Sequence, residues 1–161
     1  MILQYFKKKE NKEQIIATDQ YKKILIESKI FLNENNFFKT KNYNTSFEIV
    51  CIFLIMFIRK NLLEENRKKY LKVNEKLISI FISDLDESLR EKGIGDMSIG
   101  KYVKSYVKKF YFRISKFPEG INLYKNRSFI EYLMIIDLIK NDDYINVSRK
   151  FSDKFEYFLN F

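Results

Sequence analysis

The sequence predicts an all-α protein that folds as a single compact bundle of about six helices, and three observations support this prediction. The chain has 161 residues, which is the usual size of one domain. It contains only 4 glycines and 1 proline, whereas an all-β protein needs many more turn residues. Most segments space their apolar residues as helices do. We expect an N-terminal tail over residues 1–13 and one helical domain over residues 14–161.

The first helix is expected over about residues 14–32, where apolar side chains recur at helical spacing. The Asn-rich stretch 33–44 that follows is typical of a loop. Thr45 and Glu48 then form the pattern of a capping box, which predicts the start of a second helix.

The second helix is expected to be the central buried element, because residues 47–58 are apolar on nearly every side. Its apolar run, residues 49–58, is much shorter than the roughly 20 residues of a membrane-spanning helix. Cys51 lies within this run, so we expect a buried, reduced thiol.

The third helix is expected over about residues 73–92, where an apolar residue recurs every four positions. Gly93 suits the left-handed residue that ends many helices. Asp96 or Ser98 could cap the next helix, which is expected over about residues 99–117.

The last two helices follow a break at Pro118. Ser128 and Glu131 form a second capping-box pattern, which predicts a helix that runs to about Lys140. Asp143 is expected to cap a final helix, whose apolar face is made by Tyr144, Val147, Phe151, Phe155 and Phe158.

The composition argues against a conventional enzyme. Histidine is absent, which removes the commonest general base and the commonest metal ligand. A single cysteine can form neither an internal disulfide nor a cysteine-only zinc site. Gly93 and Gly95 lack the third glycine and the preceding strand of a nucleotide-binding loop. We expect no catalysis, no cofactor, no metal site and no small-molecule substrate.

The net charge of +9 favours an anionic partner such as RNA, the ribosome or an anionic membrane. Lysine far outnumbers arginine, however, and that bias is also typical of an AT-rich genome. The cations expected to meet an anionic surface are Lys101, Lys104, Lys108, Lys109, Arg113 and Lys116. Tyr102 and Phe112 fall among them, as in surfaces that bind nucleic acid or lipid, but a solvated helix face is the alternative.

The acidic segment just before this basic one has two interpretations. Asp84, Asp86, Glu87 and Glu91 could bind a hard cation or act as an acid and base pair. On a helix, however, Asp84 and Asp86 point in different directions, and Arg90 is close by. A salt-bridged, solvated face is the favoured interpretation.

Residues 84–113 resemble the signature of the ubiquinol–cytochrome c chaperone family. Proteobacterial members carry D-x-D-x-x-L-R-E-x-G-[VI]-G-D, followed by a glycine-lysine step, a V-K pair and F-Y-G-R. The matching positions here are Asp84, Asp86, Leu89, Arg90, Glu91, Gly93, Gly95, Asp96, Gly100, Lys101, Val103, Lys104, Phe110, Tyr111 and Arg113. Upstream, Phe47-Glu48-Ile49-Val50 resembles the family's opening of an apolar helix. Two positions depart from the pattern: Phe112 stands in place of a glycine, and Phe53 in place of a common histidine.

The resemblance implies an all-helical, non-enzymatic chaperone that binds newly made cytochrome b and assists assembly of the respiratory ubiquinol–cytochrome c reductase. It also implies a site near the ribosome and the inner membrane, on the matrix side in mitochondrial relatives, and a small partner subunit. No secretory signal is visible in the sequence, so we expect a cytoplasmic protein that is peripheral on the inner membrane.

The residues hypothesised to hold the client or partner are Asp84, Asp86, Arg90, Gly93, Gly95, Asp96, Lys101, Lys104, Tyr111 and Arg113. In this hypothesis the turn at residues 93–96 fixes the angle between the acidic and basic helices, and an apolar groove beside them receives a client helix. Two alternatives stay open: a small RNA- or ribosome-binding module without a membrane client, and a structural subunit that docks its basic face on a membrane.

Overall fold

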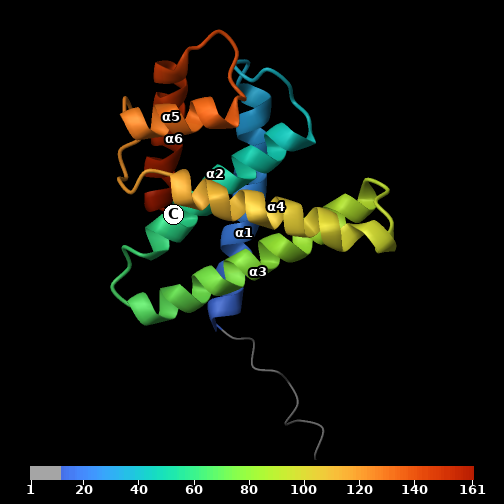
Figure 1. Cartoon of the computed structure of the whole chain (residues 1–161). Helices are drawn as coiled ribbons and strands as arrows, with labels where there is room; N and C mark the ends of the chain where they lie inside the picture. The colour runs from blue at the N-terminus through green and yellow to red at the C-terminus, as the bar shows by residue number, and fades with distance from the viewer. Residues whose placement is uncertain (1–11) are drawn as a thin grey trace, which may run out of the picture.

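The computed structural model describes residues 12–161, and this part of the chain is all-helical, as predicted. Its elements are α1 (Lys12–Glu34), α2 (Tyr43–Asn61), α3 (Arg67–Glu91), α4 (Asp96–Lys116), α5 (Arg127–Ile136) and α6 (Tyr144–Leu159), which Figure 1 labels. No strand occurs among the described residues, where Phe38 and Ile139 form an isolated antiparallel bridge. Most of the expected tail, residues 1–11, lies outside the described residues, and α1 begins two residues earlier than expected.

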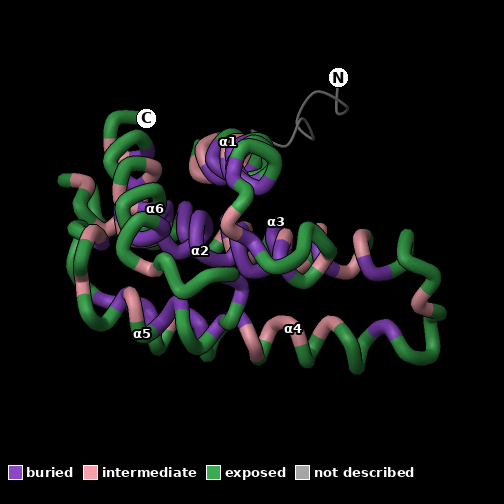
Figure 2. Tube along the Cα trace, turned by 90° about the horizontal axis from the view of Figure 1, so that it is seen from above, coloured by how far each residue is buried: buried purple, intermediate pink, exposed green. Residues whose placement is uncertain are grey.

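Helix α2 is the centre of the core, as its apolar composition predicted. Every residue from Cys51 to Phe57 is buried. Figure 2 shows the buried stretch of α2 enclosed between α1, α3, α5 and α6. The ring of Phe53 lies 5.4 Å from that of Phe31 on α1 and 5.0 Å from that of Phe158 on α6, so aromatic packing joins the first, second and last helices. Burial raises the pKa of the Cys51 thiol, which therefore stays protonated.

Helices α3 and α4 form a hairpin beside this core. Helix α4 returns along α3, and the turn between the two helices projects from the body of the protein in both Figure 1 and Figure 2. The buried residues of α3 recur every four positions, at Val73, Leu77, Phe81, Leu85 and Leu89, as the sequence indicated. Helix α4 has far fewer buried side chains, which are Ile99, Phe110 and Arg113.

Asparagines cap the starts of three helices, α2, α3 and α5, and none of these caps was predicted from the sequence. The side chain of Asn42 accepts a hydrogen bond from the Thr45 amide at 3.1 Å, so α2 begins at Tyr43. The predicted capping box of Thr45 and Glu48 is wrong. Asn42 already accepts the hydrogen bond of the Thr45 amide at the start of the helix, and Glu48 is buried. Asn66 caps α3 in the same way, which starts that helix six residues before its expected position.

Helix α5 differs from its expected range at both ends. Asn126 accepts from the Phe129 amide at 3.0 Å, so the predicted capping box of Ser128 and Glu131 is wrong. The helix stops at Ile136, short of Lys140, because Asp137 adopts a left-handed conformation with φ 50°. The chain beyond it runs beside residues 37–39 instead, through two backbone hydrogen bonds. Asp143 caps α6, as predicted, by accepting from the Asn146 amide.

Candidate client and surface sites on the helical hairpin

The turn of the α3–α4 hairpin is built around Gly93. Its φ of 88° lies in the left-handed region, as the sequence predicted. The Gly93 amide donates to the Arg90 carbonyl at 2.9 Å, and the Ile94 amide donates to the Leu89 carbonyl at 3.3 Å. This pair of hydrogen bonds is a Schellman motif, and it is accompanied by packing of Ile94 against the core.

Helix α4 starts directly after this turn. Gly95 is its N-cap, and no side chain donates or accepts a capping hydrogen bond there. The prediction that Asp96 or Ser98 caps the helix is therefore wrong. Asp96 is the first helical residue and pairs with Arg90 on α3, which Asp86 also contacts at 2.6 Å. These three hypothesised site residues thus meet across the hairpin and brace it.

The remaining acidic candidate, Asp84, lies apart from that group. Its carboxylate accepts a hydrogen bond from the Tyr21 hydroxyl on α1 at 2.7 Å. Burial, together with this hydrogen bond, raises the pKa of Tyr21. The favoured interpretation, a salt-bridged and solvated face, therefore fits Asp86, which pairs with Arg90, but not Asp84, which is half-buried against Tyr21.

Two of the six predicted surface cations turn inward onto α2. Arg113 is buried and donates two hydrogen bonds to the carboxylate of Glu48, at 3.0 and 2.9 Å. The Nζ of Lys109 lies 2.7 Å from the same carboxylate. Burial lowers the pKa of Arg113, but the hydrogen bonds to Glu48 outweigh it and leave the pKa raised. Arg113 is therefore not available to an anionic surface, which corrects its assignment to that set.

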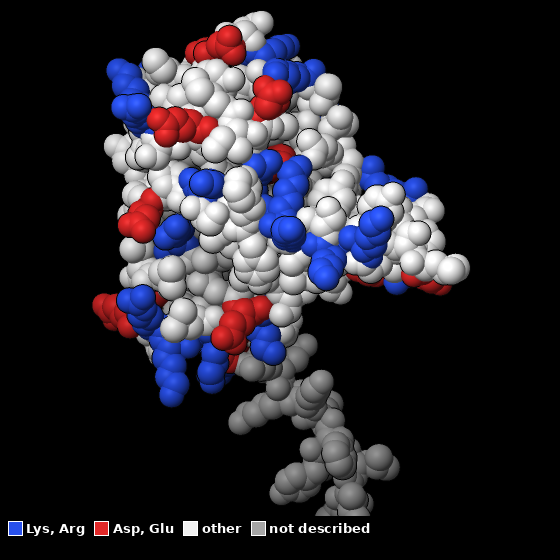
Figure 3. Space-filling view, viewed as in Figure 1, with Lys and Arg blue, Asp and Glu red and all other residues white. Residues whose placement is uncertain are grey.

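The other cations of α4 face solvent. Lys101, Lys104, Lys108 and Lys116 are exposed, and none forms an ion pair with a residue in the range 12–161. Tyr111, another candidate, is about half exposed on the same helix. Figure 3 shows the basic side chains gathered over α4 on the face turned to the viewer.

An open groove lies on the inner side of the hairpin, which we call the hairpin groove. It has a volume of about 370 Å³ and is lined mainly by Tyr43, Leu89, Ile94, Tyr102 and Tyr106. The Tyr106 ring packs 5.8 Å from Tyr43 and 4.8 Å from Phe47, which holds α4 against the start of α2. The Lys92 ammonium lies 4.0 Å above the Tyr43 ring at the rim. A groove beside the hairpin was expected from the sequence, but Tyr43 and Tyr106 were not identified as part of it, and Tyr102 was assigned to the basic surface instead.

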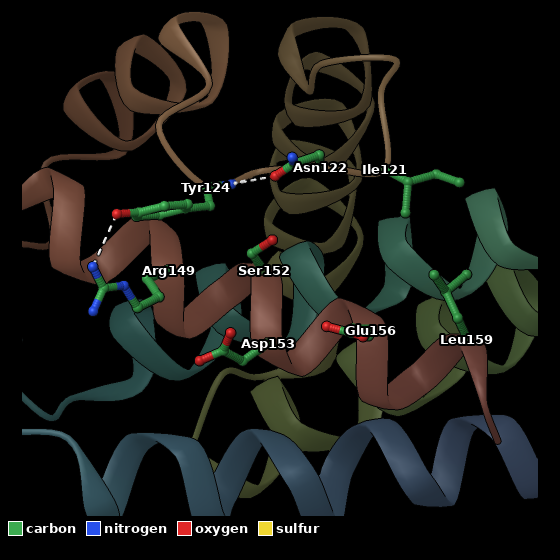
Figure 4. Close-up of a pocket in the computed structure, with 8 residues that line it drawn as sticks. All are labelled: Ile121, Asn122, Tyr124, Arg149, Ser152, Asp153, Glu156 and Leu159. Atoms are coloured by element: carbon green, nitrogen blue, oxygen red, sulfur yellow. Dashed lines mark hydrogen bonds between the residues drawn. The ribbon is translucent and has the colours of Figure 1, made fainter.

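A second hollow lies away from the hairpin, between α6 and the chain that precedes α5 (Figure 4). Its volume is about 610 Å³, and both polar and apolar side chains line it. Arg149 donates to the Tyr124 hydroxyl at 2.9 Å, and this hydrogen bond lowers the pKa of that tyrosine. The two residues thus satisfy each other, and no sequence signal marked them.

The structure therefore brings together some of the hypothesised residues and separates others. Asp86, Arg90, Gly93, Gly95 and Asp96 meet at the turn. The remaining members lie elsewhere: Asp84 contacts α1, Arg113 contacts α2, and Lys101, Lys104 and Tyr111 are exposed on α4. No described helix is long and apolar enough to cross a membrane.

Comparison with known proteins identifies a matching protein family and a similar solved structure. A family model described as ubiquinol-cytochrome C chaperone matches residues 38–129, which is more than half of the chain. A crystal structure of the Cbp3 homolog from Brucella abortus superposes with a TM-score of 0.69 at 20% identity, over 99% of this chain and 88% of that one. A search of curated proteins finds no match. The matched range holds the hairpin, its turn and the helix beneath it, and the chain belongs to the ubiquinol–cytochrome c chaperone family.

Proposed function

We propose that this protein binds newly made cytochrome b and assists its assembly into ubiquinol–cytochrome c reductase. The family supports a role as a chaperone for that complex. The observation that supports binding of cytochrome b is the hairpin groove. The family-like residues 84–113 form its walls on α3 and α4 and the turn that joins them. We propose that the protein acts by binding, without catalysis, on the cytoplasmic side of the membrane.

The hairpin groove has the chemistry that an unassembled membrane helix requires. Such a helix has an apolar surface that is covered by its neighbours only in the finished complex, and helix-in-groove contacts can cover that surface meanwhile. Tyr102 offers a half-exposed ring, and Ile94 is partly exposed at the turn. Both residues project from the rigid hairpin, so a client can reach them without opening the core.

The test uses two tyrosines on α4. Tyr102 lines the hairpin groove, whereas Tyr111 lies nine residues later and therefore on the opposite side of the helix. Their exposures are similar, at 47% and 51%, so the two alanine variants remove comparable side chains at comparable cost. We expect Tyr102→Ala to weaken capture of cytochrome b by roughly tenfold, as loss of a central interface aromatic does.

The measurement is crosslinking and pull-down of the tagged full-length protein from detergent extracts, with the amount of cytochrome b determined by mass spectrometry. Tyr111 does not line the hairpin groove, so it is no longer proposed as a client-binding residue, and Tyr111→Ala is expected to capture as much cytochrome b as the wild type. Equal capture by Tyr102→Ala and Tyr111→Ala would exclude the hairpin groove as the client site. Absence of cytochrome b from the wild-type sample would contradict the proposed function itself.

A further inference from the structure

A continuous row of side chains runs along the outward side of α4, opposite the hairpin groove. We call it the lysine stripe, and its members are Met97, Lys101, Lys104, Lys108, Tyr111 and Phe112. Their spacing of mostly three or four residues places them on one side of a helix. That side faces away from the buried residues of α4, and every member of the stripe is exposed.

The charge of the stripe is uncompensated. No acidic residue occurs between Asp96 and Glu119, and the three lysines form no ion pair with a described residue. Arg113 does not add to this exposed charge, because it is buried and donates to the Glu48 carboxylate. Lys116 adds a further exposed cation, and its Nζ lies 5.6 Å above the Phe112 ring.

Apolar side chains flank these cations at both ends. Met97 is wholly exposed at the start of α4, and Tyr111 and Phe112 are about half exposed toward its end. The distance between the ends is roughly 20 Å at the rise of an α-helix. A helix with cations between exposed apolar residues is suited to lie in a membrane interface, with apolar groups at the headgroup boundary and ammonium groups on lipid phosphates.

The surroundings leave this side free. In Figures 1 and 2, α4 and α5 form one broad face of the protein, with no other described element in front of α4. The outward side of α5, opposite its buried residues, adds the exposed Met134 to this face. We infer that this face docks the protein on an anionic lipid bilayer, with the lysine stripe as its contact.

The details favour lipid over nucleic acid. The exposed cations of α4 are all lysines, which act as point charges, whereas arginine is the usual residue for bidentate phosphate recognition. Met97 cannot stack on a base, but a thioether side chain partitions readily into an interface. The stripe is also a convex helix side, whereas single-stranded nucleic acid is usually held in a groove with aromatic platforms.

The test measures co-sedimentation of the full-length protein with phosphatidylcholine vesicles, with and without phosphatidylglycerol. The wild type is expected to bind only the anionic vesicles, and binding should fall as salt rises. The triple variant Lys101→Gln, Lys104→Gln and Lys108→Gln should lose about 100-fold in affinity, at about fivefold for each lysine. A matched triple of exposed lysines on α1 and α6, Lys22→Gln, Lys29→Gln and Lys150→Gln, removes the same charge and should bind as the wild type.

A fluorescent reporter tests the predicted orientation. The chain contains no tryptophan, so Phe112→Trp introduces a single one within the stripe. Its emission should shift to the blue on anionic vesicles, whereas a tryptophan at the exposed Leu63, in the connection between α2 and α3, should not shift.

Two results would overturn the inference. One is equal vesicle binding by the two triple variants, which would indicate that binding depends on net charge alone and not on the position of the lysines. The other is binding of a single-stranded RNA that the stripe variant loses, with no vesicle binding by the wild type, which would make the stripe a nucleic-acid surface. Lys101 and Lys104 do not line the hairpin groove, so they are no longer proposed as client-binding residues. Capture of cytochrome b in detergent should therefore be unchanged in the stripe variant, so failure here is distinct from failure of the proposed function.

Discussion

At the scale of single residues, Arg113 shows that cations close together in the sequence can have different burial and different partners in the fold. Six cations within residues 101–116 look alike in the sequence, but Arg113 and Lys109 are four positions apart and share the side of α4 that meets α2. A signal for this existed, because Glu48 is a lone carboxylate in the buried part of an apolar helix and needs a partner. Which cation supplies it depends on helix packing, which the sequence does not state.

Breaking this buried pair should be costly. Arg113→Met leaves the Glu48 carboxylate buried with only Lys109 beside it, so we expect the free energy of unfolding to fall by about 3 kcal/mol. Urea denaturation followed by circular dichroism measures this change. Lys116→Met, an exposed control on the same helix, should change the stability by less than about 0.5 kcal/mol.

The double variant Glu48→Met with Arg113→Met supplies the second arm of this test. It removes both buried charges, so it should recover most of the lost stability. If Arg113→Met is as stable as the wild type, the ion pair does not hold α4 onto α2.

At the scale of the helices, the periodicity of apolar residues predicted the elements well and their ends less well. All six predicted helices occur, since repeated burial every three or four residues is a strong signal. The starts of α2 and α5 were assigned to Thr45 and Ser128, but Asn42 and Asn126 cap these helices two to three residues earlier. Several adjacent residues could each serve as a cap, and only the path of the preceding chain selects one.

The left-handed glycine that ends α3 was predicted correctly, although the cap of α4 was not, and this glycine yields a prediction of its own. Gly93→Ala must place a side chain at φ 88°, which should lower the free energy of unfolding by about 1–2 kcal/mol. Gly100→Ala is the matched control, because Gly100 lies within α4, nothing lies within 4 Å of an added Cβ, and alanine is favoured over glycine inside a helix. Thermal denaturation followed by circular dichroism should show a lower midpoint for Gly93→Ala only. Equal midpoints for the two variants would mean that the left-handed turn does not constrain the hairpin.

At the scale of the whole protein, the hairpin carries two surfaces on opposite sides of α4. The hairpin groove faces α2 and α3, and the lysine stripe faces away from them. The sequence predicted the bundle, its central helix and the turn, because these depend on local pattern. It did not predict that Tyr43 and Tyr106 would form one groove, since they lie on different helices that only the fold brings together.

The two surfaces suggest how the protein could work as a unit. Docking through the lysine stripe would place the hairpin groove close to the membrane, where newly made membrane helices arrive. A client held there would remain near the complex that it joins. This arrangement depends on both proposals, and each of them has its own test.

The most direct measurement of the central claim is a redox difference spectrum of membranes from cells that lack the gene. The account predicts loss of the reduced cytochrome b absorbance and of ubiquinol oxidation. Both should be restored by the wild-type gene, but not by Tyr102→Ala. Deletion membranes with a normal cytochrome b spectrum and normal ubiquinol oxidation would contradict the account.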